Sequence, residues 1–188
     1  MNTERIYIFF VFSFIGWVIE LIFRSVYEKR LVNPGFHKGP WLPLYGITGL
    51  MIVFVSSLLG QQSLFIRMVF YFILSTAVEL AAGVFLELGF DKRYWDYSEN
   101  RFNIMGYICP LYSCGWVLIC LIVEFFLLGR LVELIRAIPE DILFRIDFLL
   151  LLVFSADFFI SSGIEQGRTK RVVKTLVALI NDNRKHGG

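Results

Sequence analysis

Five stretches of the sequence are each about 20 residues long, strongly apolar and poor in charge. An α-helix of that length rises about 30 Å and can cross the hydrocarbon core of a bilayer. The sequence therefore predicts an all-α, polytopic membrane protein with about five transmembrane helices. The expected spans are Ile6–Val26, Trp41–Leu59, Leu64–Leu88, Ile104–Leu128 and Ile142–Ser162.

The composition agrees with a lipid bilayer as the main partner of this chain. Apolar residues make up 57% of the chain and charged residues 18%, whereas an average soluble domain is about 25% charged. The net charge is only +2, so no basic surface indicates a nucleic-acid partner. These values exclude an ordinary soluble enzyme and a nucleic-acid-binding protein. The first span has no small-residue cleavage site, so we expect it to be retained.

The distribution of basic residues predicts the orientation of the five spans. Thirteen of the 18 Lys and Arg residues fall on one predicted face, and the rule that basic loops stay inside makes that face cytoplasmic. The N-terminus is then outside and the C-terminus inside. We expect residues 1–163 to form a single transmembrane domain and residues 164–188 a cytoplasmic tail. Within the tail, Thr169–Asn181 has the spacing of an amphipathic helix that lies on the inner leaflet or contacts a partner protein.

An internal repeat relates the first two pairs of spans. Residues 16–46 align without gaps on residues 83–113, and ten of the 31 positions are identical. Shared membrane composition explains matched Leu and Phe, but it explains matched Glu, Asn, Gly and Pro-Leu-Tyr poorly. We therefore predict two parallel helix–loop–helix units, about 6–59 and 64–128, followed by the extra span 142–162.

Three carboxylates near or within the spans are the first candidates for function: Glu20, Glu79 and Glu87. Ionisable groups are costly in a bilayer and usually face the protein interior or water. Glu20 and Glu87 correspond in the repeat, so they are candidates for a cavity-lining pair that binds a cation or carries protons. Alternatively, Glu20 pairs locally with Arg24, four residues later. Glu79 has no nearby basic residue, and it must find a partner on another helix or stay protonated.

Further acidic residues inside the spans are expected to support packing. Glu124, Asp147 and Asp157 lie a few residues inside the predicted span ends, and we expect each to form a hydrogen bond with a neighbouring helix. The region 127–141 is expected to hold a short interfacial helix that ends at Pro139.

The two predicted cytoplasmic loops carry the remaining candidates. Asn, Pro and Gly residues in these loops are typical of tight turns, and Trp and Tyr are typical of the membrane interface. Helix–hairpin architecture and interfacial anchoring explain the same residues without a binding role. The loop candidates are Asn33, Gly35, Gly39, Pro43, Tyr45, Trp95, Asp96, Asn100, Asn103, Gly106 and Tyr112.

The sequence contains no recognisable catalytic, metal or cofactor motif. There is no Ser/His/Asp set in a suitable context, no metal-ligand spacing and no phosphate-binding GxxxxGK[ST] loop. The two histidines fall in a loop and in the tail. We expect Cys109, Cys114 and Cys120 to act as small buried apolar residues, and we predict no catalytic residue, no metal and no cofactor in this chain.

Four motifs together resemble the CmpB family of small bacterial multi-pass membrane proteins, which is classed with the ABC transporters as type IV. The motifs are FIGWVIE at 14–20, NPGF…GP…PLYG at 33–46, WDYS at 95–98 and N…G…IC at 103–109. The resemblance covers residues 6–125 and implies a location in the bacterial cytoplasmic (inner) membrane and a role in transport.

The leading functional hypothesis is a permease-like membrane subunit that works with a separate ATPase, since the chain has no P-loop. A carrier driven by an ion gradient and using Glu20, Glu79 and Glu87 is the first alternative. A membrane enzyme or accessory factor acting on lipid or cell-wall intermediates, with Glu87, Asp96 and Asn100 at the interface, is the second. A purely structural or sensory module is the third. Five spans are few for a transport path, so we also expect a homodimer or another partner.

Overall fold

The chain forms a helical bundle. The structure, a computed structural model, describes the backbone of residues 2–186 and the side chains of residues 4–163. The all-α class is confirmed, because the β pairing within the described residues is limited to an isolated bridge between Ile104 and Ile108. The elements are α1 (Asn2–Glu28), α2 (Pro43–Leu59), α3 (Leu64–Phe90), α4 (Pro110–Ile122), the π-helical η1 (Val123–Leu128), α5 (Gly129–Arg136) and α6 (Glu140–His186).

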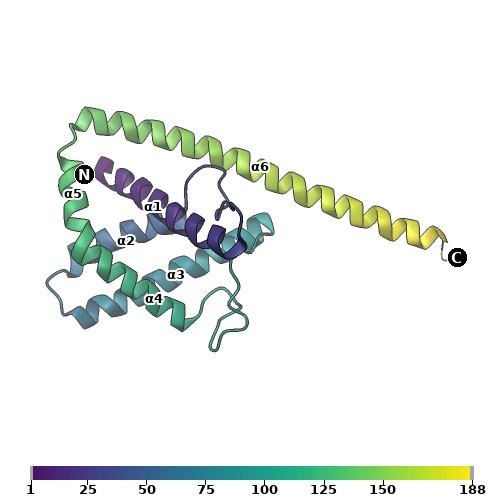
Figure 1. The fold of residues 1–188 in the computed structure, drawn as a ribbon, viewed down its shortest axis with the longest axis horizontal. Coiled ribbons are helices and arrows are strands. Elements are labelled where there is room, and N and C mark those ends of the chain that lie inside the picture. Colours follow the sequence, from purple (N-terminus) through teal and green to yellow (C-terminus); the bar gives the residue numbers. More distant parts are fainter. Residues whose placement is uncertain (1, 187–188) are drawn as a thin grey trace.

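Consecutive helices pack as hairpins. Helix α1 packs against α2, α2 against α3 and α3 against α4, while α6 lies along α1 and also contacts α3 (Figure 1). The connection between α2 and α3 is short (residues 60–63), whereas residues 29–42 and 91–109 form long loops at the opposite end of the bundle. We call the end that carries these two long loops the loop end.

Two of the helices are suited to crossing a membrane on their own. Residues 4–28 of α1 and the whole of α3 are long and apolar enough to do so, and α2 is a shorter apolar helix. These two helices support the prediction of a membrane protein. They account for two of the about five spans predicted from the sequence. Their side chains are mostly exposed at the bundle surface, as expected for helices that face lipid.

Two predicted helix starts are wrong. The helix expected from Ile104 begins at Pro110, because residues 104–109 form a tight turn in which Met105 and Gly106 have positive φ. The helix expected from Trp41 begins at Pro43. The region 127–141 holds a short helix, as predicted: α5 ends at Arg136, shortly before Pro139, although it continues directly from α4 through η1.

Proline starts both helices that follow the long loops. Pro43 and Pro110 occupy the first turn of α2 and α4, where a missing N–H is harmless and the fixed φ suits a helix. The residues before them, Leu42 and Cys109, are extended, as proline requires of its neighbour. Each loop therefore leads into its helix at a defined position.

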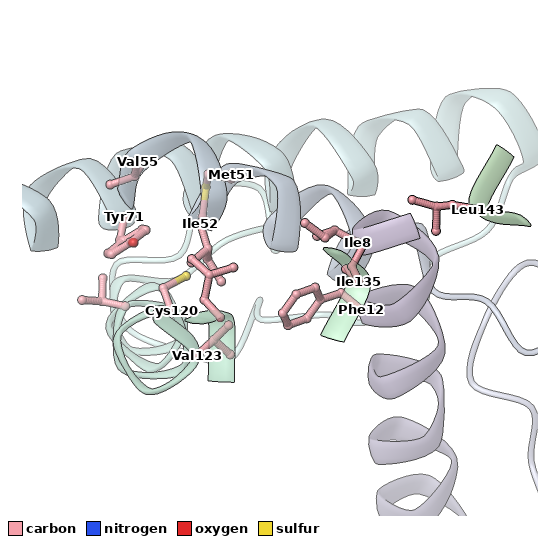
Figure 2. Packing of buried hydrophobic residues seen from close by; sticks show 12 residues of the cluster. Ile8, Phe12, Met51, Ile52, Val55, Tyr71, Cys120, Val123, Ile135 and Leu143 are labelled. Carbon is pink, nitrogen blue, oxygen red and sulfur yellow. The ribbon is translucent and has the colours of Figure 1, made fainter. Parts of the chain in front are cut away.

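The apolar core lies at the end of the bundle opposite the long loops. It joins the first half of α1, the second half of α2, the start of α3 and the chain from α4 to the start of α6 (Figure 2). Val55, Tyr71 and Cys120 are among its fully buried members. In a bilayer, such close packing stabilises the bundle through van der Waals contacts rather than through transfer of apolar surface from water. The loop end, in contrast, holds most of the polar side chains described below.

Helix α6 continues to His186, well beyond the predicted last span. The amphipathic pattern predicted for Thr169–Asn181 depends on side chains that lie outside the described residues. Cys109 and Cys120 are buried as expected, whereas Cys114 is exposed.

Candidate functional site

Glu20 on α1 is held by a tyrosine from the next helix. The hydroxyl of Tyr45 on α2 donates a hydrogen bond of 2.9 Å to Glu20 Oε1, and the guanidinium of Arg24 lies 3.7 Å from Oε2. The ring of Tyr45 packs directly on Gly16, where an added Cβ would lie 2.1 Å from Tyr45 Cγ. Gly16 thus permits the close approach of α1 and α2 that brings this hydroxyl to the carboxylate.

Glu79 is the most deeply buried carboxylate on α3. It is 2% exposed, and its Oε1 accepts a hydrogen bond of 3.0 Å from the hydroxyl of Tyr97. The indole of Trp116 on α4 lies beside the same carboxyl group, but Oε2 has no partner in hydrogen-bonding geometry. No Lys or Arg among the described residues forms an ion pair with Glu79. A buried carboxyl group with one unpartnered oxygen is unusual, since such an oxygen loses its hydration without compensation.

Aromatic rings connect the two carboxylates. Tyr45 packs edge-to-face on Trp116, with ring centroids 5.2 Å apart, and Tyr97 stacks on Tyr112 at 4.3 Å. The hydroxyls of Tyr45 and Tyr97 are each within electrostatic range of both carboxylates. We call this group the carboxylate–aromatic cluster. Its members are Glu20, Tyr45, Glu79, Tyr97, Tyr112 and Trp116.

Tyr97 reaches this cluster because the second long loop folds back towards the helices. Its backbone N–H donates to the carbonyl of Gly106 at 2.8 Å, and Gly106 in turn donates to Asn103 Oδ1 at 3.0 Å. Gly106 has φ of +73°, and a Cβ there would lie 2.5 Å from Asp96 Oδ1, so only glycine fits. Burial, followed by the nearby charge of Glu79, raises the pKa of Tyr97, which keeps its hydroxyl protonated.

Arg93 holds the base of the same loop. Its guanidinium lies 3.0 Å from Glu87 and 3.3 Å from Asp96, donates to the carbonyl of Met105 at 2.7 Å, and stacks over the ring of Tyr107. Hydrogen bonds from Ser98, with help from Arg93, lower the pKa of the Asp96 carboxyl. Glu87, near the end of α3, and Asp96 in the loop therefore both have Arg93 as a partner.

The first long loop is tied to α6 by a buried histidine–aspartate pair. His37 is 3% exposed, and its Nδ1 lies 2.9 Å from Asp157 Oδ2. Asp157 also accepts the backbone N–H groups of Lys38 and Gly39, at 3.1 and 3.2 Å. Burial lowers the pKa of His37, although Asp157 opposes this effect. We call the His37–Asp157 contact with its two backbone hydrogen bonds the loop clasp.

Asn33 organises the rest of the first loop. Its Oδ1 accepts the indole N–H of Trp17 at 2.9 Å, and its Nδ2 donates to the carbonyl of His37 at 2.7 Å. Gly35 packs against the side chain of Leu42. These residues determine the loop geometry and do not contact the carboxylate–aromatic cluster.

The sequence-predicted candidates thus separate into two groups. Glu20, Tyr45, Glu79 and Tyr112 come together in the carboxylate–aromatic cluster. Glu87 instead pairs with Arg93, so the partner of Glu20 across the cluster is Glu79. The other candidates hold loops or start a helix: Asn33, Gly35, Gly39, Pro43, Trp95, Asp96, Asn100, Asn103 and Gly106.

Four residues with central contacts are not among the site residues predicted from the sequence. Tyr97 lies within the WDYS motif, for which anchoring and a functional role are both open, and Trp116 lies one helical turn after Tyr112. His37 and Asp157 are 120 residues apart in the chain, and no local pattern relates them. Only the first two left a signal in the sequence.

The three acidic residues assigned to packing have different environments. Glu124 forms a buried ion pair of 2.9 Å with Arg67 on α3, as predicted. Asp157 bonds to the first loop rather than to a helix. Both carboxyl oxygens of Asp147 lack a partner, so the prediction is wrong for this residue.

The donor set of the cluster limits its chemistry. It offers two carboxylates, tyrosine hydroxyls and aromatic rings, and no group of three or more His, Cys, Asp or Glu suitable for a metal ion occurs among the described residues. The cluster can accept a proton or a positively charged group. It contains no nucleophile–base pair of the kind used in covalent catalysis.

The fold and this site define a small helical membrane protein with a polar cluster at one end of its bundle. The chain belongs to the CmpB family, described as "Putative ABC-transporter type IV", whose family pattern matches residues 7–162. The resemblance found in the sequence motifs is therefore confirmed. A search of solved structures finds no match to this fold.

Proposed function

We propose that this chain is a permease-like subunit of a bacterial transport system, and that its substrate or coupling ion binds at the carboxylate–aromatic cluster. The observation that carries the proposal is Glu79. It is buried, has no ion-pair partner among the described residues and leaves Oε2 unpartnered. Placing such an ionisable group within an apolar helix costs free energy, and in membrane proteins such a group commonly marks a substrate or ion path. Membership of an ABC-transporter-type family also supports a role in transport.

The proposed topology has five spans in the cytoplasmic membrane, with the N-terminus outside and the C-terminus inside. The spans are α1, α2, α3, the continuous α4–η1–α5 helix and the first part of α6. The alternating hairpins support this arrangement, because they bring both long loops to one end of the bundle (Figure 1). That end carries most of the basic residues and would be cytoplasmic.

The proposed architecture also contains two parallel repeat units, about 6–59 and 64–128, within a single transmembrane domain of residues 1–163. One feature supports it: α2 and α4 both begin at a proline from the aligned motif. The aligned glycines differ in their contacts, because Gly16 packs against Tyr45 whereas Gly83 packs against Tyr107, which is not the counterpart of Tyr45 in the alignment. The repeats differ in their acidic residues. Glu20 lies in the cluster, whereas its counterpart Glu87 is bound by Arg93.

A permease of this kind needs an ATPase subunit, which would dock on the long loops or the cytoplasmic tail, and a second copy would complete the path. Affinity purification of the tagged chain from native membranes, followed by mass spectrometry and an ATPase assay, tests this. We expect a P-loop protein in fixed ratio to the chain and ATP hydrolysis in the eluate. The ABC-type proposal is rejected if neither exceeds the level obtained with an unrelated tagged membrane protein.

A carrier driven by a proton gradient is the second candidate function, and the buried Glu79 favours it too. In that case the cluster would take up and release a proton without an ATPase. Proton flux into liposomes that contain only this chain tests the alternative. We expect flux that is lost in Glu79→Gln and kept in Glu87→Gln, and equal flux in both variants would exclude Glu79 as the coupling group.

A further inference from the structure

We propose that the carboxylate–aromatic cluster is a binding site for an organic ammonium cation. This inference rests on the proposed function, because it names the substrate class of the same site. The evidence is the combination of two carboxylates with aromatic rings at one point of the bundle.

The carboxylates of the cluster favour a cation as its ligand. Glu79 has no ion pair among the described residues, and Glu20 has only Arg24, at 3.7 Å, whose guanidinium also donates to the carbonyl of Tyr94 at 2.7 Å. A buried carboxylate loses its hydration, and a bound positive charge offsets that loss. The unpartnered Oε2 of Glu79 is the open acceptor for that charge.

The rings favour an ammonium group over a metal ion. Metal sites in proteins are built from several oxygen, nitrogen or sulfur ligands, whereas the cluster supplies two carboxylates among four aromatic side chains. Aromatic faces attract ammonium groups through their quadrupole, and such rings form the recognised cages for alkylated amines. Tyr45, Tyr97, Tyr112 and Trp116 therefore match an alkylated nitrogen better than a bare ion.

The cluster is reachable from the loop end. The side chain of Glu20 is 31% exposed and Tyr112 is 44% exposed, whereas Glu79 is only 2% exposed. Tyr97 is contributed by the second long loop and stacks on Tyr112. A ligand that binds from the loop end would thus contact Glu20 and the part of the second long loop that carries Tyr97.

Binding of choline to the purified full-length chain in neutral detergent tests the proposal. The matched control ligand is 3,3-dimethylbutan-1-ol, which has the same shape without the charge. Calorimetric titration at constant ionic strength should show saturable binding of choline and none of the neutral isostere. We expect Glu79→Gln to weaken choline binding at least tenfold and Trp116→Leu to weaken it several-fold.

Glu87→Gln is the matched control variant, because Glu87 lies outside the cluster and pairs with Arg93; it should bind choline as the natural chain does. Tyr97→Phe keeps the ring and should retain most of the affinity, so it reports on the site even if Glu79→Gln does not fold. Equal binding of choline and its isostere, or full affinity in both Glu79→Gln and Trp116→Leu, would overturn the ammonium site. Because the isolated chain is used, this result is independent of whether an ATPase co-purifies.

Discussion

Replacing Gly16 with alanine should separate α1 from α2 and disturb the cluster. An alanine Cβ at position 16 would lie 2.1 Å from Tyr45 Cγ and 2.5 Å from Tyr45 Cβ. Carbon atoms normally approach to about 3.5–4.0 Å, so the helices or the ring must move by about 1.5 Å. Overpacking of this kind costs about 1–3 kcal/mol. At about 2–4 °C per kcal/mol for a chain of this size, the melting temperature should fall by about 2–12 °C.

Thermal unfolding of the purified chain in detergent measures this effect, and Gly115→Ala is the matched control. A Cβ at Gly115 would meet nothing within 4 Å, so that variant should melt like the natural chain or slightly higher. The Gly16→Ala variant should also bind choline more weakly, because the Tyr45 hydroxyl would leave Glu20. The proposed packing is refuted if the two alanine variants melt at the same temperature and bind choline equally.

Three further predictions concern the loop clasp and the buried ion pair. Asp157→Asn should lower the free energy of unfolding by about 2 kcal/mol, because hydrogen bonds to a charged group are lost, and hydrogen exchange should accelerate in residues 33–42 but not in α3. Burial lowers the pKa of His37, so as the pH falls the unfolded chain takes up a proton at this residue before the folded chain does. The clasp should therefore lose stability below about pH 6.5. Between pH 7.5 and 5 the melting temperature should fall less steeply in His37→Asn than in the natural chain, and equal slopes would contradict this. Arg67→Met should lower the free energy of unfolding by about 3–5 kcal/mol, because it leaves Glu124 charged and buried without a partner. The double variant Arg67→Met with Glu124→Leu should recover much of that loss. A double variant as unstable as the single one would argue against the ion pair.

Much of the helical plan could be predicted from the sequence, because it depends on local patterns. Apolar runs predicted the helices, and Pro43 and Pro110 mark where two of them begin. The boundary near Ile104 was wrong because apolarity cannot distinguish a tight turn from a helix. The turn depends on positive φ at Met105 and Gly106, which hydropathy does not report.

The site was less predictable, because its contacts join distant parts of the chain. The alignment of residues 16–46 with 83–113 makes Glu20 a candidate and offers Glu87 as its partner. Arg93, six residues after Glu87, binds that carboxylate, and Tyr97 instead turns towards Glu79. The difference arises because the second loop folds back on the helices, which an alignment of the two sequence segments cannot reveal.

The central claim is that Glu79 binds a positive charge during transport. Electrical recording from native membrane vesicles adsorbed on a solid support tests it most directly, with a rapid change from sodium chloride to choline chloride at equal concentration. We predict a charge transient in vesicles that contain the natural chain or Glu87→Gln, and its loss in Glu79→Gln at equal protein level. An undiminished transient in Glu79→Gln would contradict the account.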